Sequence, residues 1–300
     1  MTQPAALPST PFRCSFAAER RGDPFTGTAA PAAGMVLVEQ PGPWGRSALV
    51  QSRLDPRVGA ALGARAVAHG MRVLLIRRPG RDPGRERRRW AVVDCRPGHE
   101  AIRWGDFGED AELTDLPLDG RAGSPSYEPC FLVCTHGRHD ACCAIRGRPV
   151  AAALEAARPG MVWECSHVGG DRFAANLVAL PHGLYYGRVD DLSAVRVAEA
   201  HESGQVVPGL LRGRSTFAPV VQAAQDHARR VLGVTAISAL QPVHTALLGQ
   251  GGWEVRLAEG HRVLVATVRA AAGETAALLT CHATHRAHPP HFEVTDLRDA

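Results

Sequence analysis

Two short polar segments near the middle of the sequence contain the residue types that best suit metal binding. Cys134 and Cys143 enclose an eight-residue polar loop. This spacing is too wide for a CxxC redox pair or a single zinc-finger knuckle, but wide enough to wrap a two-iron core. Further along, His167 and Asp171 stand four apart around a Val-Gly-Gly sequence, where glycine lets the backbone approach a bulky cofactor. The segments offer two pairs of candidate ligands.

The segments lie between predicted strands and helices that would bring them together. The patterns predict strand 131–134, helix 149–157, strand 161–165, a hairpin of strands 176–180 and 184–189, and helix 192–201. This β-α-β-β-α order is typical of a thioredoxin-like unit. Because each polar segment follows the carboxyl end of an adjacent strand, the two are expected to face each other. A 2Fe-2S cluster needs two ligands for each iron, and each segment offers one pair.

The same residues resemble a known family. The sequences CTHGRHDACCAIRGRP, from residue 134, and SHVGGDRFAAN, from residue 166, are similar to those of the sucrase/ferredoxin-like family. The resemblance is most specific over residues 134–189. It implies a thioredoxin-like ferredoxin domain whose 2Fe-2S cluster is held by two cysteines and by two histidines of an H-x-G-G-H loop. Carried over, the pattern gives Cys134, Cys143 and His167, whereas Asp171 stands where the second histidine would be.

Asp171 leaves the identity of the fourth ligand open. A carboxylate binds iron through oxygen and is a harder ligand than imidazole or thiolate. With Asp171 as a ligand, the 2+ core, two thiolates and one carboxylate sum to a charge of about −1. The expected reduction potential then lies between Rieske centres, at about −150 to +300 mV, and plant-type ferredoxins, near about −400 mV. The alternative fourth ligands are Cys142, Cys165, His136 and His139.

Each candidate also has a structural interpretation. Asp171 is equally suited to cap a short turn at 172–176, and an isolated His167 would usually be a hydrogen-bonded loop residue. Cys142 and Cys165 fit small buried positions in a helix and a strand. Three other thiols have no partners by spacing: Cys14, Cys95 and Cys281. A run of histidines fits a divalent metal site or, more simply, an exposed loop; it comprises His282, His285, His288 and His291.

The N-terminal region, residues 1–125, is predicted to form an α/β lobe. Its first 30 residues are rich in Pro, Ala and Thr and are expected to dock late or stay loose. Patterns then predict strand 35–38, helix 55–69 and strands 72–77 and 90–95. The order and the shared Gly-Met entry into a strand match residues 126–205, the predicted ferredoxin domain. We therefore expect the N-terminal lobe to be a degenerate thioredoxin-like repeat that lacks the Cys and His residues.

The remaining third of the chain, residues 206–300, is predicted to form a small α+β domain. A helix is expected over 217–232, followed by strands at 253–257, 262–269, 277–281 and 292–295. An acidic stretch rich in Gly, Pro and Ser, at 105–129, is typical of a connection between domains. The predicted fold is thus α/β with a thioredoxin-like ferredoxin domain between two other units.

Composition narrows the classes of protein. The chain of 300 residues is 45% hydrophobic and 21% charged, with a mean hydropathy of −0.11, as in ordinary globular proteins. No run approaches the length of about 18 apolar residues needed to span a membrane. The predicted location is cytoplasmic, where the eight cysteines would stay reduced. The basic run Arg85, Arg87, Arg88 and Arg89 is predicted to be a solvated hairpin turn, so no nucleic-acid partner is expected.

Electron transfer is the favoured function. A ring of arginines is expected to dock an acidic redox partner such as a flavoprotein reductase; it comprises Arg138, Arg146, Arg148 and Arg172. The alternative is a cluster-free or zinc-stabilised scaffold, since zinc accepts two cysteines, a histidine and a carboxylate. A hydrolase is less favoured because no carboxylate pair and few aromatic platforms are evident. A thiol oxidoreductase is least favoured, because no CxxC occurs.

Overall fold

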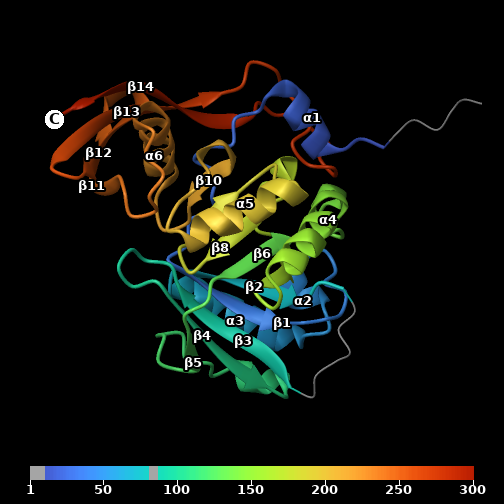
Figure 1. Cartoon of the computed structure of the whole chain (residues 1–300). Helices are drawn as coiled ribbons and strands as arrows, with labels where there is room; N and C mark the ends of the chain where they lie inside the picture. Colours follow the sequence, from blue (N-terminus) through green and yellow to red (C-terminus); the bar gives the residue numbers. More distant parts are fainter. Residues whose placement is uncertain (1–10, 81–86) are drawn as a thin grey trace, which may run out of the picture.

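The large sheet dominates the architecture. The structure, a computed structural model, describes residues 11–80 and 87–300. Within these residues one mixed sheet has ten strands, and a separate antiparallel sheet has four (Figure 1). Helices pack on both sheets. The chain is therefore a mixed α/β protein with a second, smaller sheet.

The N-terminal half contributes five strands to the large sheet. They are β1 (Gly34–Glu39), β2 (Met71–Arg77), β3 (Arg88–Asp94), β4 (Ala101–Phe107) and β5 (Ser124–Ser126), with α2 (Ala48–Gln51) and α3 (Pro56–Ala68) between β1 and β2. β1 is parallel to β2 and antiparallel to β3, and β3 is antiparallel to β4. The start of α3 is fixed by Asp55, whose carboxylate accepts the N–H groups of Arg57 and Val58.

The second half repeats this pattern of pairing. Its elements are β6 (Cys130–Cys134), α4 (Ala141–Ala157), β7 (Val162–Cys165), β8 (Leu177–Leu180), β9 (Leu184–Tyr186) and α5 (Asp191–Glu202). β6 is parallel to β7 and antiparallel to β8, and β8 is antiparallel to β9. The order β7-β6-β8-β9 therefore corresponds to β2-β1-β3-β4. This shared order is what the predicted internal repeat requires.

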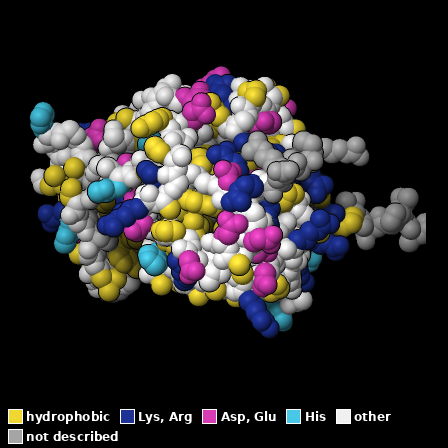
Figure 2. All heavy atoms as spheres, turned by 90° about the horizontal axis from the view of Figure 1, so that it is seen from below, with side chains coloured by type: hydrophobic (Ala, Val, Ile, Leu, Met, Phe, Trp, Pro, Cys, Tyr) yellow, Lys and Arg dark blue, Asp and Glu magenta, His cyan; other side chains and the backbone are white. Residues whose placement is uncertain are grey.

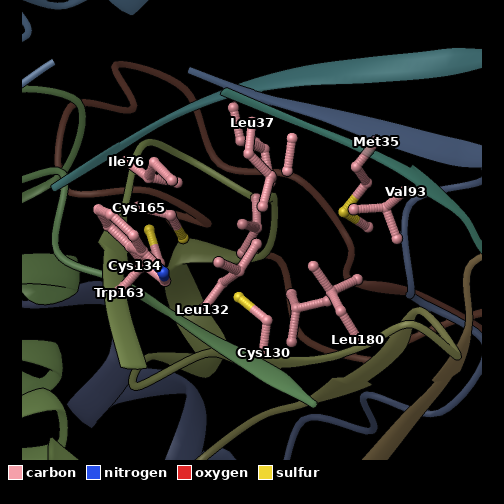
Figure 3. Packing of buried hydrophobic residues seen from close by; sticks show 14 of the residues in the cluster. Met35, Leu37, Ile76, Val93, Cys130, Leu132, Cys134, Trp163, Cys165 and Leu180 are labelled. Carbon is pink, nitrogen blue, oxygen red and sulfur yellow. The ribbon is translucent and has the colours of Figure 1, made fainter. Parts of the chain in front are cut away.

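The two halves meet at an antiparallel pair between β2 and β7, where Ile76 lies opposite Cys165. One cluster of buried side chains draws on strands of both halves, and Figure 3 shows part of it between those strands. Trp104 of β4 and Trp163 of β7 stack with ring centroids 5.6 Å apart. Two other clusters lie on the opposite faces, beneath the helices of each half. The halves therefore share one hydrophobic core, which buries the thiol of Cys134.

The helix after β6 begins earlier than the sequence predicts. The expected start at Pro149 is wrong, because α4 begins at Ala141 and Pro149 lies inside it. Asp140 provides the start signal: its carboxylate accepts the N–H of Cys142. As a result Cys142 and Cys143 occupy the first helical turn. The loop between the two proposed cysteine ligands is correspondingly shorter than expected.

Two other predicted segments differ from the structure. The leader contains a helix, α1 (Cys14–Arg21), in which Cys14 and Ala18 are fully buried, so this part is docked and not loose. The connection predicted at 105–129 contains the end of β4, a 3₁₀ turn η1 (Asp110–Leu113) and β5. Sequence patterns missed these elements because tertiary contacts, and not strong local periodicity, stabilise them.

The C-terminal region forms the small sheet and its covering helix. β10 (Leu211–Arg214) pairs with β9 and extends the large sheet. The small sheet consists of β11 (Gln241–Leu248) at one edge, then β12 (Gly252–Glu259), β13 (Arg262–Ala272) and β14 (Pro290–Asp299), and α6 (Pro219–Leu232) packs on the last three. The strand predicted at 277–281 is wrong. Only Ala277 forms a bridge there, with Ala287. The following residues instead run towards α1, as Figure 1 shows.

Surface charges are largely neutralised locally. Of the predicted basic run, Arg85 lies outside the described residues. Arg87 forms an ion pair with Glu112, and Arg88 forms one with Asp110. Figure 2 shows a face on which basic and acidic side chains are interspersed. Among the described helices, none is both long enough and apolar enough to cross a bilayer.

A buried histidine pair makes folding sensitive to acid. The His201 ring is 4% exposed, and its Nε2 lies 2.9 Å from Nδ1 of His182. Burial, with a smaller contribution from the charge of His182, lowers the pKa of His201 to about 3. Below pH of about 6.5 the unfolded chain binds a proton that the folded chain excludes, so stability present at neutral pH is lost as the pH falls.

We expect the free energy of unfolding of His201→Gln to depend less on pH than that of the wild type. Between about pH 6.5 and 4.5 the wild-type free energy of unfolding should fall by up to about 1 kcal/mol per pH unit more than that of the variant. Urea unfolding across this range measures the difference. His99→Gln, at an exposed position, is the matched control and should follow the wild type. Parallel wild-type and His201→Gln curves would contradict the assignment.

Candidate metal centre

The two proposed cysteine ligands are positioned by the end of β6 and the start of α4. Cys134 is the last residue of β6, and Cys143 lies in the first turn of α4; both side chains are buried. Gly147, one turn further along α4, permits this proximity. A Cβ at Gly147 would overlap the carbonyl group of Cys134. The sequence therefore needs glycine here for α4 to approach the strand end.

We expect Gly147→Ala to destabilise the fold and displace Cys143. Alanine gains about 1 kcal/mol of helix propensity, but the overlap with the backbone of β6 forces α4 outward at a cost of about 1–3 kcal/mol. The steric cost should win. Thermal unfolding and the yield of metal-loaded protein would measure the effect, and Gly209→Ala, where a Cβ meets no neighbour, is the control. An unchanged or higher melting temperature would contradict this packing.

The segment after β7 carries His167 and Asp171. Gly169 and Gly170 have φ of 93° and 81°, in the left-handed region that glycine favours, and they reverse the chain between the two side chains. The 3₁₀ turn η2 (Asp171–Phe173) follows, with Gly170 as its N-cap and no side-chain cap hydrogen bond. The capping interpretation of Asp171 is therefore wrong. Its carboxylate points to the cysteine and histidine side chains instead.

Arg212 fixes the position of this loop. The side chain is 1% exposed, and its guanidinium donates to the carbonyl of Gly169, at 2.8 Å, and to Asn176 Oδ1, also at 2.8 Å. It also donates to the hydroxyl and carbonyl oxygens of Thr28. Burial lowers the pKa of Arg212 to about 10. Within the described residues no carboxylate lies at ion-pair distance from this cation.

Four side chains from the two segments come together. The ligand atoms of Cys134, Cys143 and His167 all lie within 4.8 Å of one another. Asp171 Oδ1 lies 3.2 Å from Cys143 Sγ and 3.0 Å from His167 Nδ1. The structure therefore brings together all four residues that the sequence singles out. His139 joins them, since its ring stacks on that of His167 at 3.8 Å between centroids.

The contacts reduce the alternatives for a fourth ligand. His136 uses both ring nitrogens: Nε2 lies 2.8 Å from the carbonyl oxygen of Gly45, and Nδ1 accepts the N–H of His167. Cys142 points away, with its sulfur 3.4 Å from that of Cys281. Cys165 belongs to the hydrophobic core and to none of the described ligand groups. Asp171 and His139 remain within reach of His167.

Protonation in the group follows from the same contacts. A hydrogen bond from the Cys143 thiol, helped by His167, lowers the pKa of Cys134 well below its usual value although burial opposes this. The same hydrogen bond and burial raise the pKa of Cys143. Burial disfavours a charged His167, but its contacts with Asp171 and Cys134 outweigh burial and raise its pKa to about 9. Burial likewise opposes ionisation of Asp171, yet the His167 contacts lower its pKa.

The four side chains are suitable ligands for a metal ion or an iron-sulfur cluster. His167 Nδ1 is buried, and although it lies close to Asp171 it has no hydrogen bond of acceptable geometry. Nδ1 therefore has an electrostatic contact with Asp171 but no fixed hydrogen bond, and a metal that both side chains bind could replace this contact. The two thiols supply soft ligands for iron or zinc, and Asp171 or His139 completes four. A 2Fe-2S cluster and a zinc ion are both compatible with these residues.

A second group of cysteines, which sequence spacing does not reveal, forms around the side chain of Cys142. It consists of Cys14, Asp140, Cys142 and Cys281, with ligand atoms within 4.8 Å of one another. Cys14 and Cys281, which have no partners by spacing along the chain, thus acquire partners through the fold. They are 267 positions apart, and only the docking of α1 and of the C-terminal segment on α4 brings them together. The run from His282 to His291 contributes to no described ligand group.

The fold and the site together define a mixed α/β protein with Cys/His groups able to bind metal. A comparison with protein-family models matches residues 25–213 to the family described as Sucrase/ferredoxin-like. Because this match spans more than half of the chain, the protein belongs to that family, as the sequence motifs predict. No curated protein and no solved structure matches the chain.

Proposed function

We propose that this protein binds a 2Fe-2S cluster at Cys134, Cys143, His167 and Asp171 and transfers single electrons. The observation that carries the proposal is the convergence of two buried thiols and an imidazole beyond the ends of β6 and β7, with the ligand atoms of Cys134, Cys143 and His167 within 4.8 Å of one another. When bound, such a cluster supplies reversible one-electron chemistry. The family membership supports this reading of the donor set.

We infer that each half of the large sheet is a thioredoxin-like unit and that only the second half binds the cofactor. The matching strand orders support this inference, as does the absence of cysteine and histidine at the corresponding loop in the sequence of the first half. The first half then has a structural role and positions residues of the second half. Its Gly45 carbonyl holds His136, which in turn accepts the N–H of His167 and orients that residue.

The chain's own residues would set the charge and access of the site. The contacts that lower the pKa of Cys134 favour its ionised form, and the proton on Cys143, whose pKa is raised, must leave when Cys143 ligates. Arg212, buried without a described counter-charge, would stabilise an anionic centre. His167 and His139 have side chains 22% and 37% exposed, so electrons would enter beside these rings.

We also propose that an acidic flavoprotein reductase docks beside the site. The basic surface that would bind it is smaller than the sequence predicts. Arg146 pairs with Glu19 at 2.5 Å, and Arg172 lies 3.8 Å from Asp23, so both are engaged within the protein. Arg138 and Arg148 are exposed near the site and would carry the attraction. We propose a cytoplasmic location because all eight cysteines are free thiols.

Anaerobic purification followed by visible spectroscopy, iron analysis and acid-labile sulfide analysis tests the function. A brown protein with two irons and two sulfides per chain, bleached reversibly by one electron, is expected. A zinc-stabilised scaffold is the second candidate, since Asp171 replaces an imidazole by an oxygen ligand that zinc accepts. A colourless protein that binds zinc at these residues and stays colourless after reconstitution with iron and sulfide would overturn the ferredoxin reading.

A further inference from the structure

The group formed by Cys14, Asp140, Cys142 and Cys281 joins three separate parts of the chain. Cys14 begins α1, Asp140 caps α4, and Cys142 lies in the first turn of α4. Cys281 comes from the segment between β13 and β14, which Figure 1 shows beside α1. Neither Cys14 nor Cys281 belongs to the part of the chain that matches the family model. The group is therefore a feature of this chain's tertiary structure beyond the matched region.

The distances in this group are those of a small tetrahedral site. Sulfur of Cys281 lies 3.4 Å from that of Cys142 and 3.7 Å from that of Cys14. Cys14 Sγ lies 3.6 Å from Asp140 Oδ2. Zinc–sulfur bonds of about 2.3 Å give tetrahedral edges of roughly 3.8 Å, and oxygen ligands give slightly shorter ones. Small side-chain adjustments would thus suffice to enclose one ion.

The electrostatics of the group also call for a cation. Asp140 is 0% exposed, and within the described residues no arginine or histidine lies at ion-pair distance from it. Its oxygens accept the backbone N–H groups of Cys142, at 2.8 Å, and Cys281, at 2.7 Å. These bonds satisfy part of its hydrogen-bonding capacity but supply no full positive charge. A buried carboxylate surrounded by three thiols is stabilised by a divalent ion.

The backbone near this group also directs positive dipole ends towards the sulfur atoms. Cys14 and Cys142 lie in the first turns of α1 and α4, where the helix dipoles place partial positive charge. The N–H of Cys14 points to the sulfur of Cys281 at 3.5 Å. These dipoles offset the negative charge that three thiolates and a carboxylate leave around one divalent ion. The same backbone groups would orient metal-bound sulfur.

We propose that Cys14, Cys142, Cys281 and Asp140 bind one Zn²⁺ ion as a structural site, separate from the proposed cluster. Binding exchanges the thiol protons for zinc and requires no oxidant or reductant. The ion ties α1 and the C-terminal segment to the start of α4. Because Cys143 follows Cys142 directly, this clasp also holds the helix turn that presents Cys143 to the other centre.

Metal analysis of matched variants tests the site. Protein purified from cells grown with zinc and treated with a weak chelator should contain one zinc ion per chain. The variants Cys14→Ser and Cys281→Ser should each lose this ion. Cys130→Ala, which removes a buried thiol elsewhere, should retain it. Replacement by Co²⁺ should give the sulfur-to-cobalt absorption of a thiolate-rich tetrahedral site, and that absorption should vanish in Cys281→Ser. Wild-type zinc retained in both serine variants would overturn the proposal.

A second measurement covers variants that fail to fold. Cys281 is partly exposed, so its alkylation in the wild-type protein should slow at least tenfold with Zn²⁺ and return to the free rate with a strong chelator. An alkylation rate unaffected by zinc would overturn the proposal. A disulfide between Cys142 and Cys281, detected as a loss of two hydrogens by mass spectrometry of the protein purified without oxidant, would also overturn it.

Failure of this site and failure of the proposed function are distinguishable. Cys14→Ser should lose zinc but keep two irons and two sulfides, whereas Cys134→Ser should lose iron and sulfide but keep zinc. If the protein never binds a cluster, the zinc content and its loss in Cys14→Ser still test the second site. Loss of zinc only from Cys134→Ser would place the ion at the first centre and refute the second.

Discussion

Cys134→Ser and Cys143→Ser are each expected to abolish cluster incorporation. Each thiolate supplies one of only two sulfur ligands in the first centre, and a serine hydroxyl is neither soft nor acidic enough to replace it. The visible absorbance, iron and acid-labile sulfide should fall below about one tenth of the wild-type values after identical anaerobic reconstitution. The loss should occur without unfolding, which far-ultraviolet circular dichroism would check.

Cys165→Ala is the matched control for this loss. Cys165 ends β7 directly opposite Cys134 in the parallel pair and is equally buried, but it lies outside the ligand groups. The variant should lose some stability through its small cavity and keep the cluster. If Cys165→Ala and Cys134→Ser lost the cluster to the same extent, the result would reflect general disruption of the strand ends, and the ligand assignment would fail.

Asp171→His is expected to keep the cluster and raise its reduction potential. The substitution replaces an anionic oxygen ligand by neutral imidazole and removes one negative charge from a side chain that is only 7% exposed. A lower negative charge near the iron favours the reduced state. The potential should move towards the range of about −150 to +300 mV that bis-histidine Rieske centres occupy. Protein-film voltammetry or a dye-linked titration would measure the change.

Two further variants identify the fourth ligand. His139 stacks on His167 and lies 3.9 Å from Asp171, so it is the other side chain within reach. His139→Ala should leave the potential and the spectrum nearly unchanged if Asp171 ligates. An Asp171→His variant with the wild-type potential, together with a His139→Ala variant that loses the cluster, would assign the fourth position to His139.

The sequence reveals much of the first centre because its ligands come in two local pairs. Cys134 and Cys143 are nine positions apart, and His167 and Asp171 are four apart. Each pair also follows a short apolar strand that local patterns identify. Since adjacent strands that run parallel bring their carboxyl ends to one edge, local information was enough to predict that these loops meet.

Choosing among the fourth ligands required side-chain contacts. His136, His139 and Asp171 all stand within a few positions of the proposed ligands, and chemistry alone permits each. The tertiary structure uses both nitrogens of His136 in hydrogen bonds and turns Asp171 towards Cys143. The start of α4 was also missed, because Pro149 is the stronger local signal but the Asp140 cap begins the helix two turns earlier.

By itself, the sequence determined the order of strands and helices in the second half, the two local pairs of candidate ligands, and the family of the protein. Only the tertiary structure decided how the two halves share a core and which cysteines form the second group. Cys14 and Cys281 illustrate the reason. Local patterns report which residues a short segment buries, but contacts across 267 positions depend on how whole elements dock, and no spacing along the chain encodes that docking.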